Sequence, residues 1–273
     1  TRDEDDSYRQ NDWLKRWSGS SKLEWEISPF QQLTLTGNYM RQKRGNFLYW
    51  RDLNNALQPP INQVDDVVIS NRYYLTGQYR HVFSPTRFLT ARGIWFWNRF
   101  EDTVTGENGS ISTSKNMNGE VQFNTQLGQL FLTAGIEATY NTADSDLFGD
   151  RTGIGSAAYI QSEISLSRKL KTTLGTRLDY FDIDSVDADA RVNPKLGVVY
   201  KPMKGTAIRA SSGLGFRAPS MAEVFTSTNA GGLQVIPNNE LKPEKSIYGE
   251  IGANQLIGRW LMLDVAGFYS QSV

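Results

Sequence analysis

The chain has 273 residues, 29 basic residues balance 29 acidic ones, and the mean hydropathy is −0.46. A zero net charge argues against a general nucleic-acid binder, and the absence of Cys excludes disulfides, thiolate zinc sites and thiol catalysis. No uncharged apolar stretch approaches the ~20 residues of a membrane-spanning helix. Aromatic residues make up 12% of the chain, which is too many for a disordered one. No signal peptide is recognisable at Thr1, so we expect a mature chain or a piece of a longer one.

Apolar and polar residues alternate with a period of two along most of the chain, a pattern typical of strands with one buried face. One face of the segment 130–140 carries Leu130, Leu132, Ala134, Ile136, Ala138 and Tyr140. The same alternation predicts about twelve strands, at 18–28, 32–44, 71–83, 87–100, 117–127, 130–142, 157–168, 171–184, 191–201, 206–216, 246–256 and 259–272.

Short and long connections alternate between these strands. The short ones fall near Pro29, Pro85, Gly128, Lys169, Pro202 and Gly258. The long, polar ones fall at about 45–70, 101–116, 143–156, 185–190 and 217–245. A meander with its short turns at one end and its long loops at the other is the pattern of an outer-membrane barrel. A soluble sandwich would instead have Greek-key crossings, with no such sorting of loops by length.

Strand length and aromatic placement also favour a membrane barrel. The predicted strands have about 10–14 residues, and a tilted strand needs ~9–11 to cross a bilayer. Aromatic residues gather near strand ends, where an interfacial girdle would place them: Phe88, Trp95, Trp97, Phe100, Tyr140, Tyr180, Tyr200, Trp260 and Tyr269. We therefore predict an all-β, transmembrane, antiparallel up-and-down β-barrel. The alternatives are a large soluble barrel or a propeller, although no blade-length repeat is present.

Four ordered elements between 193 and 252 narrow the choice. They are Gly215-Phe216-Arg217-Ala218-Pro219-Ser220, then Glu223-Val224-Phe225, then Asn238-Asn239-Glu240-Leu241-Lys242-Pro243-Glu244-Lys245-Ser246, and finally Glu250-Ile251-Gly252. This region resembles the TonB-dependent outer-membrane receptors, whose barrels carry G-F-R-A-P-S, E-L-(Y/F), N-x-x-L-K-P-E-x-S and E-x-G in that order. Val224 stands where Leu is commoner, and Asn239-Glu240 stands for the usual Pro-Asn or Pro-Asp.

The resemblance implies a 22-strand barrel plugged by an N-terminal domain, which binds a scarce ligand and is energised through the TonB complex. No plug and no energy-coupling box are recognisable in 1–273. We therefore expect an internal part of such a barrel, with a complete 12-strand barrel as the rival. The resemblance also places the loop 217–245 outside the cell, and alternation then places 45–70, 101–116 and 143–156 there too. The expected location is the bacterial outer membrane, with lipid and lipopolysaccharide as surroundings.

The motif residues first suggest structural roles in the barrel. Pro219 ends strand pairing and begins the loop. Glu250 would face the lumen if Ile247 and Ile251 face lipid, and Arg217 is a natural partner for a lumenal carboxylate.

The loop between Arg41 and Val68 is the best candidate for ligand binding. Its aromatic and basic residues suit a large, polar, partly planar ligand: Arg44, Phe47, Tyr49, Trp50 and Arg51. The alternative is a loop whose aromatics pack on their neighbours or on lipopolysaccharide. The segment Lys43–Trp50 is similar to receptors for cobalamin or iron chelates, so the expected ligand is cobalamin, an iron-siderophore or haem.

No cofactor is expected, with calcium as the one possibility considered. Asp144, Asp146 and Asp150 fall in one predicted loop, and oxygen ligands of this kind suit Ca²⁺. The spacing matches no EF-hand, and a solvated acidic loop is the alternative.

An enzyme is not expected, because His81 is the sole histidine and nucleophile–base catalysis then has few candidates. A passive porin is the better rival, since it shares the barrel but lacks the G-F-R-A-P-S region.

Overall fold

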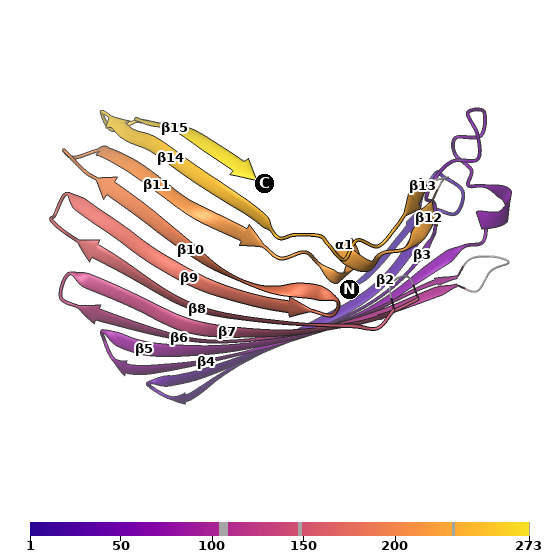
Figure 1. The fold of residues 1–273 in the computed structure, drawn as a ribbon, viewed down its shortest axis with the longest axis horizontal. Helices are drawn as coiled ribbons and strands as arrows, with labels where there is room; N and C mark the ends of the chain where they lie inside the picture. The colour runs from indigo at the N-terminus through magenta and orange to yellow at the C-terminus, as the bar shows by residue number, and fades with distance from the viewer. Residues whose placement is uncertain (104–108, 147–148, 231–232, 273) are drawn as a thin grey trace.

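The computed structural model describes residues 1–103, 109–146, 149–230 and 233–272. They form one 13-stranded antiparallel sheet in which each strand pairs with the next along the chain (Figure 1). Its strands are β1 (Arg2–Asp6), β2 (Trp13–Ser28), β3 (Gln31–Gly45), β4 (Val67–Ser84), β5 (Arg87–Thr103), β6 (Ser110–Leu127), β7 (Leu130–Ser145), β8 (Arg151–Ser165), β9 (Leu170–Ile183), β10 (Val186–Tyr200), β11 (Thr206–Arg217), β14 (Glu244–Ile257) and β15 (Leu261–Ser272). The sheet is curved and open, with β1 and β15 at its two edges.

Three short elements complete the fold. A 3-10 helix, η1 (Ile61–Gln63), lies in the loop after β3, and α1 (Met221–Phe225) follows β11. The strands β12 (Thr228–Ala230) and β13 (Leu233–Val235) form a separate hairpin-like pair. Within the described residues, no helix has the length and apolar character needed to cross a bilayer.

All twelve predicted strands are present, and the all-β up-and-down architecture is confirmed. Most strands run further into the predicted loops than expected. The long connection predicted at 185–190 is wrong: β9 and β10 are joined by Asp184 and Ser185 alone, and Ser185 has a positive φ of 63°. The segment 186–191 belongs to β10, where Asp187, Asp189 and Arg191 alternate with Val186, Ala188 and Ala190. The loops predicted at 101–116 and 143–156 are likewise shortened, and 104–108 and 147–148 lie outside the described residues.

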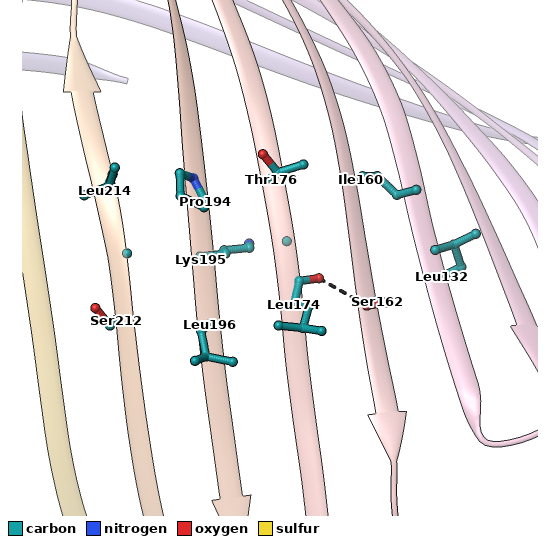
Figure 2. A pocket seen from close by; sticks show the side chains of 12 residues that line it. Leu132, Ile160, Ser162, Leu174, Thr176, Pro194, Lys195, Leu196, Ser212 and Leu214 are labelled. Carbon is teal, nitrogen blue, oxygen red and sulfur yellow. Dashed lines mark hydrogen bonds between the residues drawn. The ribbon is translucent and has the colours of Figure 1, made fainter.

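The two faces of the sheet differ in chemistry. One face carries Leu132, Ile160, Leu174 and Leu196 on neighbouring strands, with small hydroxyl residues between them, because the register pairs Leu132 with Ser162, Ile160 with Thr176 and Leu174 with Leu196. Figure 2 shows these side chains side by side along a shallow groove of about 570 Å³. We call this the outward face, since a membrane barrel turns its apolar side to lipid.

The opposite face carries ion pairs within and between strands, so we call it the lumenal face. Arg177 on β9 pairs with Glu137 (2.8 Å) and Asp179 (2.6 Å). Arg209 on β11 pairs with Glu250 (3.0 Å) and Asp264 (2.9 Å). Polar side chains on one face and apolar ones on the other are what the lumen and lipid sides of a barrel require.

Pairing along the sheet is uneven at one place. Strands β10 and β11 pair over six residues only, from Tyr200–Ile208 to Lys195–Gly213, whereas the other neighbouring long strands pair over twelve or more. Above Lys195 the two strands diverge (Figure 1), and a cavity of about 520 Å³ opens between them. We call this feature the β10–β11 seam.

A small hydrophobic core lies beside the seam, at the end of the sheet that carries α1. Phe181 and Ile183 of β9 are buried against Val224 and Phe225 of α1. Partly buried apolar residues pack around them: Val186, Phe216, Ala218, Met221 and Leu241. Phe181 and Ile183 lie on the same face of β9 as Arg177 and Asp179, because side chains two residues apart in a strand share a face. Therefore α1, which packs on Phe181 and Ile183, lies on the lumenal side of the sheet.

Candidate functional site

The longest connections all leave the same end of the sheet, and we call it the loop end. They are 46–66 between β3 and β4, and 218–243 between β11 and β14 (Figure 1). The opposite, short-turn end has connections such as Pro29–Phe30 and Gly128 with Gln129. In outer-membrane barrels short turns are periplasmic and longer loops extracellular, so the loop end corresponds to the expected extracellular side.

The second loop begins with a short helix whose start is fixed by its own sequence. Ser220 is the N-cap of α1: its hydroxyl accepts a hydrogen bond from the Glu223 backbone N–H at 3.3 Å. The Glu223 carboxylate accepts in return from the Ser220 backbone N–H at 2.8 Å. This reciprocal capping box satisfies donors that a helix start leaves free. The Ser220 and Glu223 positions of the motif are thereby explained.

Arg217, the last residue of β11, ties this helix to the sheet. Its guanidinium donates two hydrogen bonds to Glu223, at 3.1 and 3.0 Å, and two to Glu244 at the start of β14, at 3.0 and 2.7 Å. We call this set of three residues the Arg217 clamp. Forked pairs of this kind are the strong, directional form of an ion pair. The bonds from Arg217, and then those from Ser220, hold the pKa of Glu223 at about 2, well below its usual 4.5.

The remaining motif residues have packing roles. Gly215 lies directly against the Ser246 side chain, and a Cβ there would collide with its hydroxyl. Gly252 lies under the Arg209 guanidinium, and a Cβ would approach Arg209 Cζ to 2.9 Å. Glu250 on the same face accepts the bond from Arg209, as the predicted lumenal orientation requires. Phe216 packs on Phe181 with ring centroids 5.6 Å apart.

The remaining loop residues of the motif, Ala218 and Leu241, contact the core around α1, while Pro219 and Pro243 lie at the two strand–loop junctions.

The first loop, 46–66, is anchored where it leaves and rejoins the sheet. The Asn46 backbone N–H donates to the Asp66 carbonyl at 3.0 Å, and Asn46 Nδ2 donates to Asp102 at 3.4 Å. Asn11, from the connection before β2, donates to the carbonyls of Gln63 and Asp66 at 3.2 and 2.8 Å. Asn11 comes so close to Gly45 that a Cβ on Gly45 would collide with it. Residue patterning does not predict this contact, because it joins segments far apart in the chain.

The five predicted ligand residues lie in different settings. Arg44 is on β3, and the Arg51 Nε–H donates to the Pro59 carbonyl at 3.1 Å inside the loop. Phe47 lies under the Arg9 guanidinium, 4.9 Å from the ring centroid. Tyr49 and Trp50 are 43% and 56% exposed, and Tyr49 accepts a hydrogen bond from Gln63 at 3.2 Å. Of the five, only these last two present large exposed aromatic surfaces.

The acidic residues considered for calcium do not converge. Within the part of the chain that the structure describes, no three His, Cys, Asp or Glu side chains gather as metal ligands do. Asp144 lies in β7, Asp146 accepts a hydrogen bond from the Ile111 backbone N–H at 2.7 Å, and Asp150 directly precedes β8. The calcium site expected from Asp144, Asp146 and Asp150 is therefore not formed by the described residues.

His81 lies near the short-turn end of β4, in a row of aromatic rings. Its ring centroid is 6.4 Å from that of Tyr79 and 4.3 Å from that of Phe83. Tyr79, His81 and Phe83 are two residues apart along β4 and all lie on its outward face. His81 therefore belongs to an interfacial aromatic group and not to the loop end.

Comparison with known proteins identifies the architecture. A family model described as TonB dependent receptor-like, beta-barrel, matches residues 1–272. An iron-regulated outer membrane virulence protein of Vibrio cholerae serotype O1 is 23% identical over 261 residues, which cover 92% of this chain and 38% of that protein. Transferrin-binding protein A of Neisseria meningitidis serogroup B is 30% identical over 132 residues, 42% of this chain and 14% of that one.

Solved structures share the fold. The siderophore receptor PirA of Pseudomonas aeruginosa superposes with a TM-score of 0.75 at 17% identity, covering 95% of this chain and 46% of that one. The hemophore receptor HasR of Serratia marcescens superposes with a TM-score of 0.79 at 13% identity, with the same coverage. The chain thus spans less than half the length of each of these relatives.

Proposed function

The chain belongs to the TonB-dependent receptor-like β-barrel family of the bacterial outer membrane, and from that premise we propose that it is the barrel portion of an importer of a ferric chelate. The whole receptor would bind an iron-siderophore or haem at the loop end. Energy for import would come through the TonB complex, by way of a plug domain.

One observation carries the choice of ligand class. The anchored loop 46–66 presents Tyr49 and Trp50 to solvent at the loop end, and planar aromatic side chains suit the flat, conjugated groups of such chelates. The names of the relatives add support, since they refer to iron regulation, a siderophore and heme. Cobalamin, which the segment Lys43–Trp50 also suggested, is the alternative ligand.

A growth experiment tests the proposal. A strain that lacks its own receptor is complemented with the full-length protein and grown on iron-siderophore, haem or cobalamin as the limiting nutrient. We expect rescue on an iron chelate, and a roughly five- to hundredfold weaker response for the Tyr49→Ala, Trp50→Ala double variant, since two stacked aromatic contacts contribute about 1–3 kcal/mol. Phe30→Ala, an exposed aromatic at the short-turn end, is the matched control.

Two results would count against the proposal. Rescue on cobalamin alone would show that the ligand is cobalamin and not an iron chelate. Uptake that continues after the proton-motive force is dissipated would favour a passive porin over an energised importer.

A further inference from the structure

A row of aromatic rings crosses the outward face of β3, β4 and β5 near the loop end. Tyr39, Tyr73 and Trp97 are paired in register across the three strands. Their ring centroids are 4.9 and 5.2 Å apart. Trp and Tyr rings at this height mark the membrane–water interface of a barrel.

Basic side chains lie immediately beyond that row, on the same face. Asn71 of β4 pairs in register with Arg41 of β3 on one side and with Arg99 of β5 on the other. The Cα atoms of the two arginines are therefore two strand spacings apart, about 10 Å. Lys115 on β6 is opposite Trp97 and continues the aromatic row. Lys43 is two residues beyond Arg41 on the same face of β3. We call Arg41, Lys43, Arg99 and Lys115 the outward basic cluster.

These cations are poorly neutralised by the protein. Within the described residues, Arg41 and Lys115 have no ion pair, Lys43 contacts only the Trp13 ring at 5.9 Å, and Arg99 reaches Glu101 at 3.7 Å. On the outward face of β3 to β6, the described residues include no carboxylate besides Glu101. Three lumenal arginines differ, since Arg92, Arg177 and Arg209 each pair with a carboxylate at 3.1 Å or less, whereas lumenal Arg72 bonds the Asn98 amide.

Cations beside a hydrocarbon phase are costly unless an anion meets them. The anions available at this height are the phosphates of the lipid leaflet. Because the loop end is extracellular, that leaflet consists of lipopolysaccharide, whose lipid A carries phosphates on a sugar backbone above its acyl chains. Guanidinium groups bind phosphate oxygens as a fork, and ammonium groups bind them as point charges.

We propose that the outward basic cluster is a binding site for the phosphorylated head of lipid A. Arg41 and Arg99 donate to phosphate oxygens from either side of Asn71, and Lys43 and Lys115 extend the positive surface along and below them. The acyl chains lie over Tyr39, Tyr73 and Trp97 toward the apolar centre of the outward face. The site is independent of the cargo that the receptor carries.

The test uses the full-length receptor purified in detergent. The variant Arg41→Gln, Arg99→Gln is compared with wild type for binding of lipopolysaccharide, by titration and by the lipid retained in native mass spectrometry. Losing two charge-assisted contacts should weaken binding by about tenfold or more. Arg168→Gln, Lys201→Gln, which removes two exposed charges at the short-turn end, should bind as wild type does.

Two further arms identify the chemistry. Dephosphorylated lipopolysaccharide should bind wild type as weakly as intact lipopolysaccharide binds the double variant. Vesicles of phosphatidylglycerol should compete poorly. Equal binding by the double variant and wild type would overturn the proposal, as would equal loss in the control. If dephosphorylated lipopolysaccharide binds the wild type as tightly as the intact lipid does, binding comes from apolar contact alone and the phosphate site is refuted. If phosphatidylglycerol competes as well as lipopolysaccharide does, the site accepts any anionic lipid and is not specific for lipid A. Heat-resistant migration of every variant on gels confirms that it is folded.

Discussion

Arg217 and Glu223 are joined by two parallel hydrogen bonds of 3.1 and 3.0 Å, and the same guanidinium holds Glu244 across the mouth of the second loop. One arginine therefore fixes the end of β11, the start of β14 and the helix between them.

Removing the acidic partner should loosen the helix and leave the sheet intact. In Glu223→Gln the amide keeps the shape of the side chain but loses the ion pair, so we expect faster proteolysis between 218 and 243 with unchanged strand content by circular dichroism. Glu240→Gln, an exposed carboxylate in the same loop with no clamp contact, is the control. Equal proteolysis of the two variants would contradict the role of the clamp.

The order of this helix should also depend on pH. The pKa of Glu223 is lowered from 4.5 to about 2, so its contribution is complete above pH 4.5 and is lost as the pH falls through 2. A fluorophore at Ala222→Cys should report loosening between pH 4 and 2 in the wild type. The same probe combined with Glu223→Gln should show no transition in that range, and a transition of the same size there would assign the titration to another group.

The packing of α1 predicts a larger effect than its charges do. Phe225 is 2% exposed and lies in the core formed with Phe181 and Ile183. Phe225→Ala should weaken the docking of α1 by about 3–5 kcal/mol, the usual cost of emptying a buried aromatic site. Hydrogen exchange of the α1 amides measures this local loss. Phe30→Ala, at an exposed site, should leave that exchange unchanged.

A side chain at the glycine of the E-x-G motif should displace the guanidinium packed over it. In Gly252→Ala the new Cβ would lie 2.9 Å from Arg209 Cζ, so the guanidinium must move away from Glu250. We expect a lower unfolding temperature in detergent. Gly267→Ala, on the neighbouring strand β15, has no heavy atom within 4 Å of its new Cβ and should leave that temperature unchanged or slightly raised. Equal unfolding temperatures for the two variants would show that the Arg209–Glu250 contact contributes nothing.

The sequence predicted the strands well because alternation is a local property that survives in every long strand. It missed β1, whose residues Arg2–Asp6 are all charged and carry no apolar face. It also misjudged the start of β10, where the polar residues Asp187, Asp189 and Arg191 alternate with the small apolar residues Val186, Ala188 and Ala190. The predicted loop at 185–190 followed from that polarity.

The candidate site was predictable in outline only. The ordered motif from Gly215 to Gly252 identified the family, and the pairing of Arg217 with a carboxylate followed from charge. That Glu223 caps a helix and bonds Arg217 depends on a five-residue turn that no periodicity signals. Likewise, the use of Arg51 inside its own loop depends on the fold of residues 51–59.

The β10–β11 seam determines where the sheet would separate under force. Within the sheet, six residue pairs join β10 to β11, and the core around α1 also bridges the seam, because Phe181 and Ile183 of β9 pack on Val224 and Phe225. The cavity above the six pairs separates the backbone of 190–193 from that of 214–216. A force that pulls the wall outward would concentrate there, because β10 and β11 share the fewest residue pairs of any two neighbouring long strands. The strands before the seam and those after it would then separate as two units. The Arg217 clamp would move with the second unit.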